Sequence, residues 1–83
     1  MSITERLKLI IEEEGITRPA LERKTGIKVK RWSNIFNGTA KLYADEVEAI
    51  CKLWPQYAYW LCTNEDLPEA GQVRPKNPTK LTK

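Results

Sequence analysis

The chain has 83 residues, of which 41% are hydrophobic and 30% are charged, and its formal net charge is +3. A chain of this length forms one domain and buries a limited share of its surface, so we expect modest stability unless it oligomerises. No apolar run approaches the roughly 20 residues that span a bilayer. No secretory signal pattern is present either, and we therefore expect a cytoplasmic protein without membrane association.

Metal and catalytic sites are disfavoured by the residue types present. There is no histidine, and the two cysteines, Cys51 and Cys62, do not form a Cys-x-x-Cys pair, so a zinc site has too few ligands. We expect two reduced thiols packed as small apolar residues, with a disulfide between them as the lesser alternative. Without a Gly-rich phosphate loop or a paired acid and base, the sequence predicts no enzyme, no cofactor and no small-molecule ligand.

Residues 3–14 are predicted to form the first helix. Ser2 and Glu5 match a capping box at its start, apolar residues recur on one face, and Gly15 ends it. The pattern indicates an amphipathic helix that packs one face against the core.

Two short helices joined by a tight turn are predicted next, over residues 18–25 and about 29–36. Thr17 is a good N-cap, and Pro19 is tolerated in a first turn because its missing N–H would have no partner there. Gly26 supplies the left-handed conformation that ends the first of these helices. The second helix has an apolar inner stripe and an outer face of cations and amides, which suits phosphates and base edges.

The positive charge is concentrated in this helix pair. Residues 18–41 have a net charge of +6, whereas residues 1–17 sum to −2, residues 42–67 to −4 and residues 68–83 to +3. A binder of anionic surfaces in general would spread its cations more widely. The concentration is typical of a single nucleic-acid-binding face.

The helix pair resembles the Xre/Cro-like helix-turn-helix of phage repressors, without gaps through the motif. The matching positions are Thr17, Leu21, Gly26, Ile27, Ser33, Ile35 and Gly38. The likeness covers roughly residues 3–63, and residues 55–75 are similar to small prophage-encoded regulators of proteobacteria. Three positions depart from the usual pattern: Glu22 replaces a small residue, Thr25 an aliphatic residue, and Trp32 an isoleucine or valine.

The resemblance implies an all-α fold, a compact five-helix lambda-repressor-like DNA-binding domain over residues 1–67. Residues 68–83 contain three prolines and little apolar surface, and they are predicted to form a flexible, disordered basic tail. Such a tail usually does no more than keep the protein soluble. Contact of the tail with phosphate or with a partner is the less favoured interpretation.

The implied function is that of a double-stranded DNA-binding transcriptional regulator, most simply a phage or prophage repressor. It would bind a pseudo-palindromic operator as a homodimer, with the third helix in the major groove. The expected base-reading residues are Val29, Lys30, Arg31 and Asn34. Lysine can donate to guanine, asparagine can pair with adenine, and valine can touch a thymine methyl group. The expected phosphate-binding residues are Arg18, Lys28, Asn37, Thr39 and Lys41.

Two further helices are predicted, over about 44–54 and 56–62. The second contains or adjoins four aromatic residues, Trp54, Tyr57, Tyr59 and Trp60, which are too many for a two-turn helix to bury. They either cap a thin core or form a dimer interface, and Tyr57 and Trp60 are the favoured interface residues. Ala58, Leu61 and Cys62 are spaced to face inward.

Two other functions remain open from the sequence. The first is a protein-binding module, an antirepressor or host-protein inhibitor, that uses the aromatic cluster and the acidic fourth helix. The second is an excisionase-like architectural DNA binder. Binding to DNA in a mobility-shift assay separates the first from a DNA-binding regulator.

Overall fold

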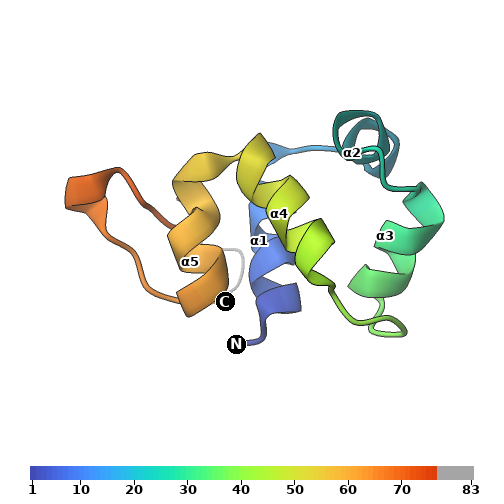
Figure 1. Cartoon of the computed structure of the whole chain (residues 1–83), viewed down its shortest axis with the longest axis horizontal. Coiled ribbons are helices and arrows are strands. Elements are labelled where there is room, and N and C mark those ends of the chain that lie inside the picture. The colour runs from blue at the N-terminus through green and yellow to red at the C-terminus, as the bar shows by residue number, and fades with distance from the viewer. Residues whose placement is uncertain (77–83) are drawn as a thin grey trace.

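The computed structural model describes residues 1–76, and residues 77–83 lie outside the described part of the chain. In Figure 1, α1 lies near the centre, with α2 and α3 on one side and α5 on the other, and the turn that follows α5 forms the far end. The elements in chain order are α1 (Ile3–Glu14), α2 (Arg18–Thr25), α3 (Val29–Phe36), α4 (Ala44–Leu53), the 3-10 helix η1 (Pro55–Tyr57), α5 (Ala58–Thr63) and the 3-10 helix η2 (Pro68–Ala70). The predicted all-α architecture with five α-helices is confirmed.

Local sequence sets where the first helices begin and end. Ser2 Oγ accepts from the Glu5 N–H at 3.1 Å, and Glu5 Oε1 accepts from the Ser2 N–H at 2.7 Å, which is the predicted capping box. The Thr17 hydroxyl accepts from the Ala20 N–H at 3.3 Å at the start of α2. Gly26 ends α2 with a φ of +76°, which glycine adopts readily because it has no Cβ.

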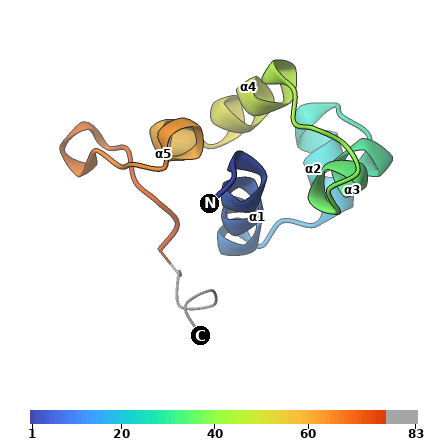
Figure 2. The same ribbon diagram turned by 90° about the horizontal axis from the view of Figure 1, so that it is seen from below.

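One apolar core joins all five helices. α1 packs against α3 and α5, and α2 packs against α3 and α4. Figure 2 shows this arrangement from below, with α1 between α5 on one side and the α2–α3 pair on the other. The buried apolar side chains are Leu7, Ile10, Leu21, Trp32, Ile35, Phe36, Ile50, Tyr57, Trp60 and Leu61. Every helix contributes at least one of them, so the helix pair depends on the whole domain for its support.

A buried arginine ties the start of the chain to α5. Arg6 is only 7% exposed. Its Nε donates to the Leu61 carbonyl at 2.8 Å, and its Nη1 donates to the Met1 carbonyl at 2.7 Å. The guanidinium thereby satisfies one of the carbonyl groups that the last turn of a helix leaves without a partner.

Tyr57 and Trp60 face the core, so the expectation that they are exposed is wrong, and the interface predicted at them loses the exposure on which it depended. Only 5% of Tyr57 and 3% of Trp60 are exposed, whereas Cys62, expected to face inward, is exposed. The physical reason is that Tyr57, Trp60 and Leu61 follow helical spacing from η1 into α5, and this stripe packs on the core. The Tyr57 hydroxyl also donates to Glu14 Oε2 of α1 at 2.7 Å.

Residues 68–76 fold back onto α5, which corrects the prediction that the disordered tail begins at residue 68. An antiparallel bridge links Leu67 to Gln72 around η2, and the Val73 N–H donates to the Gln56 carbonyl at 2.9 Å. The Gln72 side chain accepts from the Tyr59 N–H at 2.9 Å and donates to the first carbonyl of η1 at 3.0 Å. These hydrogen bonds to the start of α5 replace the apolar burial that the composition lacks. The rest of the predicted tail lies outside the described residues.

Candidate nucleic-acid interface

α3 begins with a hydrogen bond from a side chain of the preceding helix. Its N-cap residue, Lys28, carries no side-chain acceptor and leaves the first turn uncapped. Glu22 of α2 supplies the acceptor, because the Val29 N–H donates to Glu22 Oε1 at 2.8 Å. The carboxylate also lies where the partial positive charge of a helix N-terminus favours an anion. The larger residue at this position therefore joins α2 to the start of α3.

The indole of Trp32 fixes α3 against the end of α2. This side chain is fully buried, and its ring stacks on Phe36 with the centroids 5.9 Å apart. Its Nε1–H donates to Thr25 Oγ1 at 3.3 Å, and the Thr25 hydroxyl donates to the Leu21 carbonyl at 2.7 Å. A buried N–H without an acceptor is costly. Thr25 and Trp32, both departures from the usual pattern of the resembled family, therefore satisfy each other.

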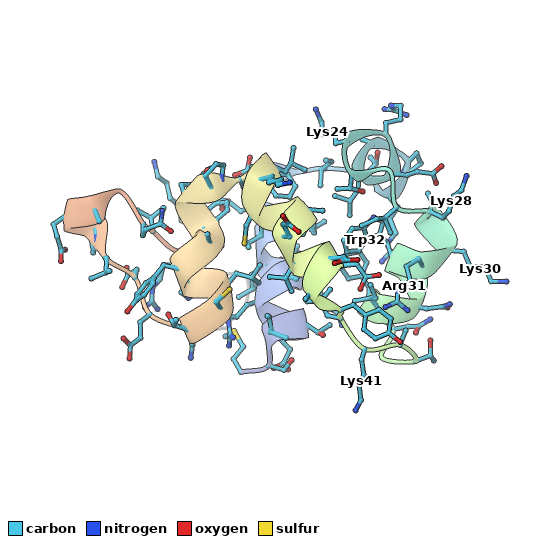
Figure 3. The ribbon with its side chains drawn as sticks, in the orientation of Figure 1. Lys24, Lys28, Lys30, Arg31, Trp32 and Lys41 are labelled. Atoms are coloured by element: carbon cyan, nitrogen blue, oxygen red, sulfur yellow. The ribbon has the colours of Figure 1, made fainter. Side chains whose placement is uncertain are left out.

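Opposite this packed side, α3 presents a surface of cations and amides. Lys28 and Lys30 are exposed, and Val29 and Asn34 are half-buried. Figure 3 shows Lys30 pointing away from the body of the molecule, with Lys28 at the same end of α3. Neither lysine forms an ion pair within residues 1–76. Four of the residues predicted to contact DNA thus share one accessible part of the surface.

Arg31, predicted as a base-reading residue, is not free on that surface but is engaged within the protein. Its Nε and Nη2 both donate to the carboxylate of Glu46 in α4, with the Nη2–Oε1 distance at 2.9 Å. Nη2 also donates to the Lys41 carbonyl at 2.6 Å. The ring of Tyr43 covers the guanidinium, with 4.5 Å between Cζ and the ring centroid. An intramolecular carboxylate therefore occupies the donors that a base contact at Arg31 would use.

Glu46 is the structural residue that sequence reasoning missed. It is 6% exposed, and its Oε1 accepts from the Tyr43 N–H at 2.7 Å at the start of α4. The hydrogen bond from Arg31 holds the pKa of the Glu46 carboxyl below its usual range, against the opposing effect of burial. The available signal was its place in the first turn of α4, where a capping acid is expected.

Four of the five residues predicted to bind phosphate lie near the C-terminal end of α3, and the fifth, Lys28, lies at its N-terminal end. Arg18 lies over the Phe36 ring, with 5.0 Å between Cζ and the centroid. Asn37 Oδ1 accepts from the Thr39 N–H at 3.1 Å and from its hydroxyl at 2.8 Å. Lys41 points away from the molecule in Figure 3 and forms no ion pair in the described part of the chain. The Thr39 hydroxyl therefore holds the loop, while the Asn37 amide nitrogen and the two cations remain available.

A groove beside these residues adds α1 to the same surface. Lys8 of α1 lines it together with Arg18 and Asn37, and Lys8 also lines an adjoining groove that reaches Lys41. Sequence reasoning missed Lys8, because one lysine on the polar face of an amphipathic helix carries no signal of its own. Lys8 is therefore a third cation beside Arg18 and Lys41.

Other kinds of site find little support in residues 1–76. No group of three or more histidine, cysteine, aspartate or glutamate side chains there is arranged to hold a metal ion. Both cysteines are free thiols, and burial raises the pKa of the Cys51 thiol. No helix in this part of the chain has the length and apolarity to cross a bilayer.

Comparison with known proteins adds a family and a structural relative. A family model described as a helix-turn-helix domain matches residues 4–67. The structure of Pf6r from the filamentous phage Pf6 of Pseudomonas aeruginosa PA01 is similar, with a TM-score of 0.78 and 33% sequence identity. The match covers 90% of this chain and 96% of that chain, so it extends well beyond the helix pair. No curated protein matches the chain at a significant level.

Proposed function

This chain belongs to the helix-turn-helix domain family of DNA-binding regulators, and we propose that it is a phage or prophage repressor that inserts α3 into the major groove of an operator. One observation carries the proposal. At the outward face of α3, Lys28 and Lys30 form no ion pair within residues 1–76, and the helix is fixed from behind by Glu22 and Trp32. A rigid element that presents free donors is what direct readout of base edges requires.

Base reading is assigned to three residues of α3. Lys30 donates to O6 and N7 of a guanine, Asn34 pairs with an adenine through its amide, and Val29 contacts a thymine methyl group. Replacing Asn34 by alanine should cost about 1–3 kcal/mol on the best site and little on random DNA. Equal losses on both would remove Asn34 from the base-reading set.

Phosphate binding is assigned to the residues that flank α3. Its N-terminal end is flanked by Lys28, and its C-terminal end by Arg18, Asn37 and Lys41. Thr39 supports the loop between Asn37 and Lys41. Replacing Arg18 or Lys41 by alanine should weaken binding to all sequences alike and lower the salt slope by about one unit. A loss confined to one sequence would instead indicate a base contact.

Useful specificity requires two copies, because one small domain contacts only a few base pairs. We propose a homodimer on a pseudo-palindromic operator with half-sites about 10 bp apart. The deciding experiment is selection of bound sites from random DNA, followed by sedimentation of the free protein and of the complex. Inverted half-sites and a two-protein complex are expected, whereas a single unrepeated site with a monomer would contradict the dimer.

The protein-binding alternative loses its main support. It invoked the aromatic cluster and the acidic fourth helix, and two of the four aromatic side chains, Tyr57 and Trp60, are buried in the core. A failure to recover any enriched DNA site, with the protein folded, would restore it.

A further inference from the structure

We infer that Arg31 is a positioning residue, held by Glu46, that fixes the α3–α4 loop (residues 37–43) relative to the base-reading face of α3. This inference rests on the proposed DNA-binding function and deepens it, because it separates the residues that touch DNA from one that places them. Its position on the same short helix as Lys30 and Asn34 makes Arg31 an obvious candidate for a DNA contact. The geometry points to a different role.

The Arg31–Glu46 contact uses both oxygens of the carboxylate. Two guanidinium nitrogens donate to one carboxylate, which is the paired geometry that arginine favours and lysine cannot reproduce. The Glu46 side chain is 8% exposed, against 27% for Arg31. If Arg31 swung outward to DNA, it would leave a nearly buried carboxylate without its cation, which is strongly unfavourable.

The same two side chains also bind the backbone of the α3–α4 loop. Arg31 Nη2 donates to the Lys41 carbonyl, and Glu46 Oε1 accepts from the Tyr43 N–H. The backbone is therefore fixed at Lys41 and at Tyr43, in a loop without regular helix or strand. Lys41, a proposed phosphate contact, extends from this fixed backbone. Its place relative to α3 depends on the Arg31–Glu46 pair.

Tyr43 is 63% exposed, and its ring nevertheless lies over Arg31. Its ring covers one face of the guanidinium and leaves less of it accessible to a phosphate or a base. Stacking of a cation on an aromatic face is attractive, and it biases the side chain toward the clamped position. The ring therefore favours positioning over direct contact.

Positioning by Arg31 and electrostatics alone predict opposite changes in DNA affinity for Glu46→Gln. Glu46→Gln removes a negative charge from a protein that binds a polyanion, so charge alone predicts tighter DNA binding. Release of Arg31 toward DNA would also predict tighter binding. Loss of positioning predicts weaker binding, because Lys41 is no longer held opposite its phosphate.

The test measures the affinity of the full chain for its selected operator at several salt concentrations, by fluorescence anisotropy. We expect Glu46→Gln and Arg31→Gln each to weaken binding by about tenfold and to lower the salt slope by about one. The double variant should bind no more weakly than either single variant, because both remove the same contact. Site selection with Arg31→Gln should return the same bases as the wild type.

Glu48→Gln is the matched control. Glu48 lies on the same helix and makes the same change in charge, but its carboxylate pairs with Lys52 at 3.3 Å and is 64% exposed. It should leave affinity unchanged or slightly raised. Arg31→Lys keeps the charge without the paired geometry, and it should lose almost as much affinity as Arg31→Gln. This second variant keeps the test decisive if Glu46→Gln does not fold.

Tighter binding by Glu46→Gln, additive losses in the double variant, or altered base preference in Arg31→Gln would each overturn the inference. Amide hydrogen exchange of the free protein separates these outcomes from a failure of the proposed function. Arg31→Gln should speed exchange at residues 41–43, whether or not DNA binds. Unchanged exchange there would overturn the positioning role, whereas faster exchange in a protein that binds no DNA would overturn only the proposed function.

Discussion

The two ends of the molecule are held by different kinds of interaction. At the α2–α3 end, polar side chains make the decisive contacts between elements, as Glu22 does for α3 and Glu46 does for Arg31. At the α5 end, buried aromatic residues and backbone hydrogen bonds do so, with the Gln72 side chain joining the C-terminal turn to the helix. The first end therefore adds ion-pairing and capping carboxylates to its packed core, whereas the second adds hydrogen bonds to backbone groups.

The difference follows the charge distribution. Residues 18–41 carry a net charge of +6, and residues 42–67 carry −4. A region rich in like charges is destabilised by mutual repulsion unless acids are placed among them. Glu22 and Glu46 are those acids, and each also accepts a backbone N–H at a helix start. The same two carboxylates thus lower the repulsion and orient the helices.

The largest expected effect is at the core of the basic end. Trp32→Ala should lower the free energy of unfolding by about 3–5 kcal/mol, since it empties a fully buried site and removes the hydrogen bond to Thr25. Chemical denaturation measures it. A loss below about 1 kcal/mol would mean that this end does not depend on the indole.

Gln72→Ala sharpens the comparison from the other end. It removes two hydrogen bonds at the start of α5 and should lower the free energy of unfolding by about 1–2 kcal/mol. Affinity for DNA and its salt slope should not change under conditions in which the variant is folded. A changed salt slope would break the separation between the two ends.

Glu22 offers a smaller, graded effect. Glu22→Ala removes the cap of α3 and should lower the free energy of unfolding by about 1 kcal/mol, whereas Glu22→Gln keeps an acceptor and should lose less. Thermal unfolding followed by circular dichroism compares the two. Equal losses would assign the effect to the charge rather than to the hydrogen bond.

Lowering the pH should cause the smallest loss of stability, and that loss should come mainly from Glu46. The folded-state pKa of Glu46 is lowered from an ordinary value of 4.5, so its contribution to stability is present above that value and is lost as the pH falls through the lowered one. Denaturation at pH 6 and at lower pH should show this loss in the wild type. Glu46→Gln should show less of it, with a remainder from Glu5, whose pKa is lowered mainly by the Ser2 backbone N–H.

The α2–α3 motif was largely predictable from the sequence because its signals are local. Thr17, Gly26 and helical spacing specify where the two helices lie, and the helix bounds predicted there agree with the structure. The positions of Arg31 and Trp60 were not predictable in the same way. Arg31 meets an acid fifteen residues later, and Trp60 faces the core on a stripe that begins at Tyr57 in η1. Both depend on how distant elements pack, which periodicity within one helix does not report.

The pairing of Trp32 with Thr25 has a consequence for how such motifs diverge. The indole N–H needs an acceptor in the core, and the threonine hydroxyl is that acceptor. Replacing threonine alone with an aliphatic residue would leave the indole unpaired. Replacing tryptophan alone would leave an empty volume. Descendants of this chain are therefore expected to retain both residues or to exchange both together, which would make the two alignment columns covary.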